Sequence, residues 1–180
     1  MSEQSNHIEG ASYGEQLLES ARRNNTELLL SIKVELKNDS EKLANLINST
    51  REAMSLNTGL HIACYAGNWE FIDIVLDIEG VEIDPTNREG KTPLHLAVQY
   101  SVEEPEHGYF VIDNLLDAGS DPTIKDKHGL EPIRYVKDNE QLKQLLESAQ
   151  YAISMEQDTA GIEVEDNDED EGEATPSESE

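Results

Sequence analysis

The sequence GKTPLHLAVQY, residues 90–100, contains the tetrapeptide Thr92-Pro93-Leu94-His95. Thr92 is a good helix N-cap, because a threonine hydroxyl can accept a hydrogen bond from an unpaired N–H of the first turn. Proline suits the first helical position, since it has no N–H and its φ is already helical. His95 then falls at the third helical position, where a polar side chain can reach back to the cap. We therefore interpret the tetrapeptide as a helix start, and not as part of a catalytic or metal site.

A similar arrangement recurs along the chain, which indicates internal repeats. Thr58-Gly59-Leu60-His61 precedes it at an offset of 34 (92 − 58 = 34), and Glu131-Pro132-Ile133-Arg134 follows it at an offset of 39 (131 − 92 = 39). A second apolar group with helical spacing follows each of the first two starts. Its members are Phe71, Ile72, Val75 and Leu76 in one copy, and Val111, Ile112, Leu115 and Leu116 in the other. The repeating unit is therefore predicted to be a pair of short antiparallel helices.

Turn signals separate these units. In LLDAGSDPTIKDKHG, residues 115–129, Gly119 stands just past a helix, where a left-handed C-cap is expected. Asp121-Pro122 and His128-Gly129 follow as turn dipeptides. The corresponding stretch of the preceding unit, EGVEIDPTNREG, carries Asp84-Pro85 and Gly90.

With these motifs the chain resembles the ankyrin-repeat family, whose unit of about 33 residues has a β-turn, two helices and a T-P-L-H motif. The resemblance implies an all-α fold, an α-solenoid of helical pairs joined by β-turn loops. We expect the repeat domain at residues 13–150, after a flexible N-terminus at 1–12 and before a disordered acidic tail at 151–180. Its four units, including the caps, are placed near residues 13–50, 55–87, 89–124 and 128–150.

Three departures from a regular repeat are informative. The offset of 39 corresponds to one repeat plus about six residues, which we place near SVEEPE, residues 101–106. Such an insertion can belong to a binding face or be a tolerated surface loop. A longer insertion, VELKNDSEKLANLINSTREAM at residues 34–54, is predicted to contain an additional short helix. Glu131 and Arg134 replace the capping threonine and the histidine in the last unit, which suits an atypical terminal repeat.

Charge gives the second strong signal. The 180 residues include 13 Lys and Arg against 39 Asp and Glu, for a net charge of −26. From Glu156 onward there are 12 acidic residues and no basic one, so residues 1–155 keep a net charge of −14 (13 − 27 = −14). No basic stripe is available to displace counterions from nucleic acid, which excludes a nucleic-acid partner. A basic protein is the natural complement of this surface.

The acidic tail is dense in like charge and low in hydrophobic residues, as is typical of disordered segments. It can serve to keep the protein in solution, or it can attract a basic partner. Ser177 has Glu180 three residues downstream, an arrangement that resembles sites of acid-directed kinases. Ser177 is therefore a candidate phosphorylation site.

Membrane and secretion signals are missing from the sequence. No apolar run approaches the length of about 18 residues that a membrane-spanning helix needs. The stretch MSEQSNHIEG lacks the layout of a signal peptide. The single cysteine, Cys64, cannot form an internal disulfide, which favours a reducing compartment. We expect a monomer that binds no membrane and resides in the cytoplasm or also in the nucleus.

The sequence carries none of the common motifs for catalysis or cofactor binding. The chain has no Gly-rich phosphate loop, H-E-x-x-H, C-x-x-C or G-x-S-x-G motif. Its five histidines do not pair at metal-ligand spacing; they are His7, His61, His95, His107 and His128. We predict a protein that is not an enzyme and holds neither a cofactor nor a metal.

The resemblance to ankyrin repeats implies a protein-binding module. Because some small acidic ankyrin proteins escort newly made basic proteins, we hypothesise a chaperone for a basic client such as a ribosomal protein. The alternative is a regulatory or scaffold subunit of a larger enzyme. Interface hot spots are enriched in Trp, Tyr and Arg. The candidate partner-binding residues are Tyr65, Trp69 and Tyr100, with Arg88, Lys125 and Lys127 as weaker candidates. For Trp69, packing between adjacent repeats is an equal alternative.

Overall fold

The computed structural model describes residues 10–161, and the candidate phosphorylation site Ser177 lies outside this range. Within it, eight α-helices and one short 3-10 helix follow one another, and none of the described residues forms a β-strand. The elements are α1 (Tyr13–Arg23), α2 (Thr26–Glu35), α3 (Ser40–Ser49), α4 (Gly59–Ala66), α5 (Trp69–Leu76), α6 (Pro93–Tyr100), α7 (Pro105–Asp117), η1 (Pro132–Tyr135) and α8 (Glu140–Ala160). The prediction of an all-α fold is confirmed.

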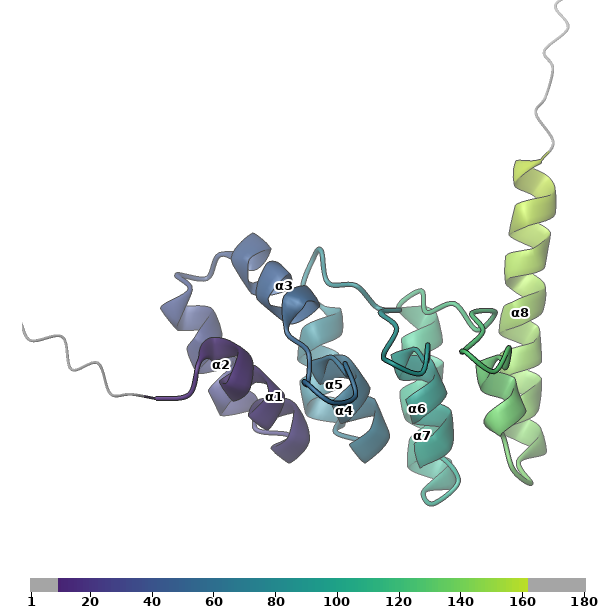
Figure 1. Cartoon of the computed structure of the whole chain (residues 1–180). Helices are drawn as coiled ribbons and strands as arrows, with labels where there is room; N and C mark the ends of the chain where they lie inside the picture. The colour runs from purple at the N-terminus through teal and green to yellow at the C-terminus, as the bar shows by residue number, and fades with distance from the viewer. Residues whose placement is uncertain (1–9, 162–180) are drawn as a thin grey trace, which may run out of the picture.

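The helices form pairs that stack in one row (Figure 1). One layer contains α1, α4, α6 and η1, each of which contacts the next along the row. The other layer contains α2, α5, α7 and α8, each packed on its own partner in the first layer. We call these the inner and the outer layer. The arrangement is the α-solenoid that the repeats predicted.

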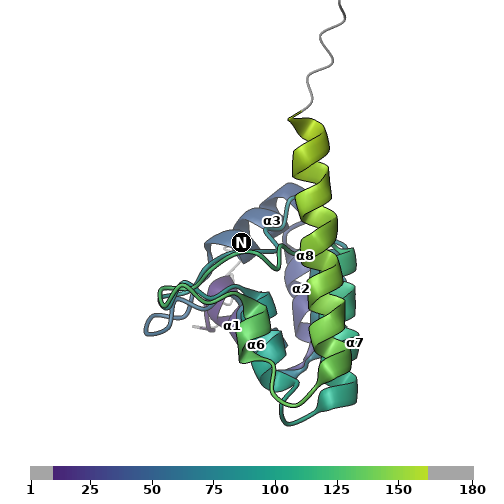
Figure 2. The same ribbon diagram turned by 90° about the vertical axis from the view of Figure 1, so that its right-hand side faces the viewer.

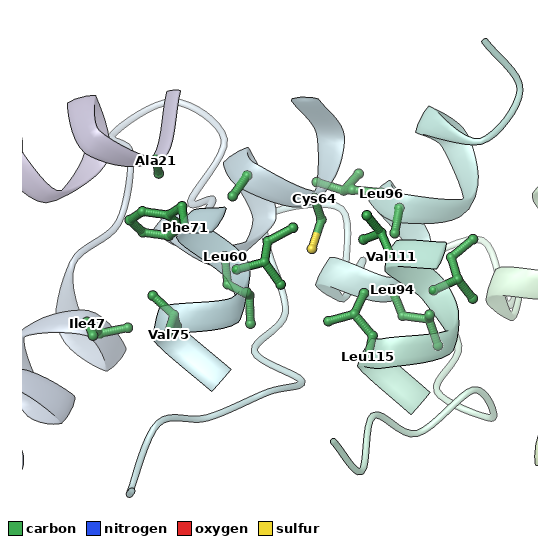
Figure 3. Packing of buried hydrophobic residues seen from close by; sticks show 14 of the residues in the cluster. Ala21, Ile47, Leu60, Cys64, Phe71, Val75, Leu94, Leu96, Val111 and Leu115 are labelled. Carbon is green, nitrogen blue, oxygen red and sulfur yellow. The ribbon is translucent and has the colours of Figure 1, made fainter. Parts of the chain in front are cut away.

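The core runs without interruption between the two layers (Figure 3). Leu60 and Cys64 of α4 and Leu94 of α6 are fully or almost fully buried, as are Phe71 of α5 and Val111 of α7. Each unit therefore buries its apolar face only by stacking on its neighbours. Burial raises the pKa of the Cys64 thiol, so this cysteine packs as a small hydrophobe and is not a reactive thiol.

The helix predicted within the long insertion is present as α3. Its side chains Leu43, Ala44 and Ile47 are buried, and Asp39 caps its first turn by accepting a hydrogen bond from Lys42 N. The Asn48 side chain donates to Gly80 O at 2.8 Å and accepts from Glu82 N at 2.8 Å. These bonds fix α3 against the turn that follows α5.

The shorter insertion lies between α6 and α7, as predicted. The segment from Ser101 to Gly108 corresponds to Gly67 and Asn68 of the preceding unit, which gives six extra residues (8 − 2 = 6). Only part of it forms the loop, since Pro105–Gly108 make an additional first turn of α7. Gly108 permits this turn, because a Cβ there would lie 2.5 Å from Ser101 Cα.

The last unit differs from the predicted helical pair. Its first element, η1, is a single 3-10 turn, and Glu131 provides no side-chain cap. The Glu131 carboxylate instead accepts a hydrogen bond from Gln150 Nε2 of α8 at 2.9 Å. This bond ties the start of η1 to the last helix.

The predicted domain limit at residue 150 falls inside α8 and not at its end. Residues 151–160, expected in the disordered tail, are helical. Asn139 caps the helix by accepting from Leu142 N, and the first glycine after this start is Gly161. Since neither Gly nor Pro interrupts residues 140–160, nothing ends the helix earlier. The acidic stretch at residues 162–180 lies outside the described residues.

Candidate functional site: a groove over the inner helices

Two buried histidines organise the inner layer. Thr58 Oγ1 accepts from His61 N, and His61 Nδ1 accepts from Thr58 N at 3.1 Å, which completes a capping box. Because Nδ1 is an acceptor, the ring proton is on Nε2, which donates to Lys91 O at 2.8 Å. The imidazole therefore caps α4 and also holds the turn that leads into the next unit.

Thr92 and His95 repeat this geometry at α6. Thr92 N donates to His95 Nδ1 at 3.1 Å, and His95 Nε2 lies 2.9 Å from Leu130 O. Burial lowers the pKa of His61 to about 4 and also lowers the pKa of His95. Both rings are thus neutral at pH 7 and fully occupied by structural hydrogen bonds. They have no free lone pair for catalysis or for a metal.

Three turns project together from the same side of the stack (Figure 2). They connect the units at residues 51–57, 84–91 and 121–130, and backbone bonds join them. Arg88 N donates to Ser55 O at 2.8 Å, and Lys127 N donates to Glu89 O at 2.9 Å. Consequently the turn tips form a continuous edge beside the inner helices.

Two hollows lie over the inner helices, the first beside this edge and the second near the C-terminal end of α6. One hollow, of about 330 Å³, is lined by Met54, Ser55, Asn57, Tyr65, Asn87, Arg88, Glu89 and Leu96. A second hollow, of about 570 Å³, is lined by Tyr65, Gln99, Tyr100, Val102, Glu103, Tyr135 and Lys137. Tyr65 belongs to both hollows, so we treat them as one feature, the inner groove.

The inner groove exposes two large side chains, one on an inner helix and one at its edge. Tyr65 is 63% exposed at the end of α4, and Met54 is 83% exposed at a turn tip. The neighbours of Tyr65 on α4, Ala63 and Cys64, point into the core. Tyr65 is consequently displayed on a rigid helix, which suits an anchor for a partner protein.

Comparison with known proteins agrees with this architecture. Residues 17–126 match the family model described as ankyrin repeats, in three copies. The chain belongs to the ankyrin-repeat family. The matched range begins within α1, ends within the third turn and leaves out η1 and α8, the irregular last unit.

A yeast relative of similar length supports the same assignment. The present chain is 47% identical over 151 residues to a protein named "Ankyrin repeat-containing protein YGL242C" from Saccharomyces cerevisiae (strain ATCC 204508 / S288c). The aligned region covers 82% of this chain and 83% of the relative. The similarity therefore extends well beyond the repeats that the family model matches.

The ionic contacts of the groove wall involve Lys91. Its Nζ lies 2.8 Å from Glu89 Oε2 and 5.0 Å from the centroid of the Tyr135 ring. The Tyr135 hydroxyl donates to Asp126. Burial, with the Asp126 hydrogen bond, raises the pKa of Tyr135 to about 12, so this hydroxyl stays protonated. These contacts fix the wall of the groove near the last unit.

The predicted binding residues fall in different places. Tyr65, Tyr100 and Arg88 line the inner groove. Lys125 and Lys127 are exposed on the third turn and line neither hollow. Trp69 packs edge-on against Phe110 of α7, with ring centroids 4.7 Å apart, in the outer layer. The geometry at Trp69 favours the alternative that it packs between adjacent repeats.

Tyr100 has a structural contact as well. Its ring lies over Gly67, where any Cβ would overlap it, and it meets His107 edge-on at 5.8 Å between ring centroids. His107 Nε2 in turn lies 2.8 Å from Gly67 O. The extra turn of α7 therefore braces the preceding unit, a role that neither of the two interpretations of the insertion included.

Several groove residues were missed by sequence reasoning, among them Met54, Gln99, Tyr135 and Lys137. Two of them, Met54 and Gln99, could have been found from the repeat spacing, because each is equivalent to a predicted binding residue. Met54 and Arg88 occupy equivalent positions in successive units, and so do Tyr65 and Gln99 (88 − 54 = 99 − 65 = 34). Tyr135 and Lys137 lie in the irregular last unit, where the spacing gives no equivalent position.

Within the described residues, no three His, Cys, Asp or Glu side chains gather as a metal site would require. None of the helices in that range is long and apolar enough to cross a membrane. Chemically, the groove offers aromatic and apolar contact area with a few charged groups at its edges.

Proposed function

We propose that this ankyrin-repeat protein is a non-enzymatic module that binds a partner protein in the inner groove. The observation that carries the proposal is Tyr65, which is 63% exposed and lines both hollows of the groove. A large aromatic side chain on a rigid helix loses little conformational entropy on binding and buries much area. Arg88 at the groove edge adds a second residue type that is enriched at hot spots.

The chemistry of the partner is proposed from charge. The outer helices α5 and α7 carry five acidic residues and no Lys or Arg; the acidic residues are Glu70, Asp73, Glu106, Asp113 and Asp117. Together with the net charge of −26, this surface attracts a basic protein over long range. We propose an escort for a basic client in the cytoplasm, with the inner groove giving short-range contact.

A regulatory or scaffold subunit is the second candidate. It is favoured by the inner groove itself, which is less acidic than the outer helices and has Arg88 and Lys137 in its lining. Such a subunit would bind through apolar and aromatic contacts with little dependence on salt. An escort would bind a basic client with a strong dependence on salt.

The test compares two tyrosines that are equally exposed. Tyr65→Ala alters the inner groove, and Tyr151→Ala removes a side chain that is also 63% exposed but lies on α8. Each full-length variant is used as bait for affinity capture, and the bound proteins are quantified by mass spectrometry. We expect Tyr65→Ala to lose the captured partner, with an unchanged melting temperature. Equal capture by the two variants would contradict the inner groove as the binding site.

The identity and salt dependence of the captured protein separate the two candidates. Recovery of a basic protein that elutes at modest salt supports the escort. Recovery of an enzyme complex that resists salt supports the scaffold subunit and contradicts the escort.

A further inference from the structure

The last helix extends well past the helix beside it (Figures 1 and 2). When Leu115 and Leu116 of α7 are aligned with Leu145 and Leu146 of α8, Asp117 corresponds to Glu147. From that level α8 continues for 13 residues (160 − 147 = 13), whereas α7 ends at Asp117. At a rise of 1.5 Å per residue, the extension is about 20 Å long. None of the side chains in this extension is buried.

A groove of about 480 Å³ lies where α7 ends beside α8. Leu116 of α7 and Leu145, Ala149 and Ile153 of α8 supply its apolar surface, and all four are partly exposed. The turn at Gly119 leaves it open, because a Cβ at Gly119 would meet no atom within 4 Å. We call this feature the end groove. It belongs to the outer layer and shares no lining residue with the inner groove.

The rim of the end groove is acidic. Asp113, Asp117 and Glu156 line it, and no Lys or Arg does. The C-terminal end of α7 also points here, and the helix dipole makes such an end favourable for cations. Neither α7 nor α8 has a basic residue in its last turn, in contrast to α1, which has Arg22 and Arg23 there. The site therefore combines an apolar surface with uncompensated negative charge.

This charge decides what can occupy the end groove. The chain's own residues 1–9 and 162–180 contain no Lys or Arg, so neither segment complements the rim. A second copy of the protein would bring the same acidic rim. We propose that the end groove docks a basic amphipathic helix of a partner protein, with its apolar face on Leu116, Ala149 and Ile153. This mode of recognition uses apolar anchors at helical spacing, with lysines or arginines facing the rim.

The experiment uses the full-length protein labelled with 15N and a synthetic helical peptide with leucines on one face and lysines on the other. We expect amide shifts centred on Leu116, Gly119 and Ala149, with little change at Tyr65. A peptide with glutamates in place of the lysines is expected not to bind. Shifts confined to residues 162–180 would overturn the proposal, because they would show attraction to the acidic sequence alone.

Two lysine substitutions on α8 give a matched pair. Ala152→Lys places a cation in the end groove, and Ser154→Lys makes the same charge change on an exposed residue outside it. Exposed charges change affinity modestly, so we expect Ala152→Lys to weaken peptide binding about threefold more than Ser154→Lys. Equal effects of the two variants would overturn the proposal. Self-association of the free protein that Ala152→Lys abolishes would also overturn it, in favour of a second copy.

Discussion

Single side chains hold neighbouring units together in this protein. The imidazole of His61 accepts a hydrogen bond at its own cap and donates another to Lys91 O in the next unit. The bond at the cap requires the neutral ring, because a protonated Nδ1 cannot accept a hydrogen bond, and the side chain is fully buried. The strength of the link between units therefore depends on the proton occupancy of His61.

Acid should weaken this link. The folded pKa of His61, about 4, lies below its ordinary value of 6.5, so the unfolded chain binds more protons between these values. The stabilisation is present above pH 6.5 and is lost as the pH falls toward 4. We expect the His61 contribution to decrease by about 2 kcal/mol between pH 7 and pH 5. This contribution is measured by urea unfolding of the unmodified protein and of the His61→Gln variant at both pH values. A stability difference between the two proteins that stays constant would contradict this prediction.

The cap at Thr92 can be tested at neutral pH. Its hydroxyl accepts from His95 N and is buried together with the ring. Loss of an N-cap costs about 0.5–2 kcal/mol, and we expect Thr92→Ala to lower the free energy of unfolding by this amount. A thermal melt identical to that of the unmodified protein would show that the cap contributes nothing.

These caps could be predicted from sequence because a capping box is local and joins residues three apart. The bonds from Nε2 to Lys91 O and Leu130 O could not, because they join residues 30 and 35 positions apart. The role of Tyr65 as a candidate binding residue could be predicted, because it depends only on residue type and on position in the repeat. The involvement of Tyr135 depends on how the last unit packs, which no local pattern specifies.

Among the helices, α5 and α7 are joined by an aromatic contact near their N-terminal ends. Trp69 is half-buried and meets Phe110 edge-on, while the inner groove lies in the other layer. We expect Trp69→Ala to destabilise the fold by about 1–3 kcal/mol, as for other losses of packed area, and to leave partner binding intact. Melting temperature and affinity capture are measured together. Loss of binding with an unchanged melting temperature would restore Trp69 to the binding face.

The prediction of helices was most accurate where repeats stack on both sides, as in α4 to α7. It failed at the last unit, where Glu131 bonds to α8 instead of capping η1. It also ended α8 too early, because acidic composition was taken to indicate disorder. Amino-acid composition does not show where a helix is capped, and α8 is capped at its start by Asn139.

For the molecule as a whole, the net charge of −26 should set the rate of encounter with a basic partner. A chain ending at Gly161 keeps α8 intact, whereas one ending at Met155 would remove its last residues. We expect the full chain to associate faster than the shortened chain at low salt. The difference should shrink as the Debye length falls to about 8 Å. Stopped-flow association with a basic partner measures both rates, and equal rates at low salt would leave the tail a solubility role only.

Phosphorylation at Ser177 stays a prediction, since this residue lies outside the described chain. It would add about −1.5 to −2 charges and should increase the same association rate without altering the melting temperature. Intact mass measurement of the protein from cells, followed by kinetics of the modified form, tests it. An unchanged rate would show that the modification does not act through charge.

The length of α8 has a bearing on local opening. Its only fully buried side chains, Leu142 and Leu146, lie in its first half. The amides around them can exchange with deuterium only when the last unit separates from the stack, whereas those after Tyr151 need only the fraying of a solvent-exposed helix end. The exchange rate should therefore rise steeply from the N-terminal to the C-terminal half of this helix. A partner seated beside its second half would slow that exchange, so the same helix reports both the integrity of the stack and the occupancy of its end.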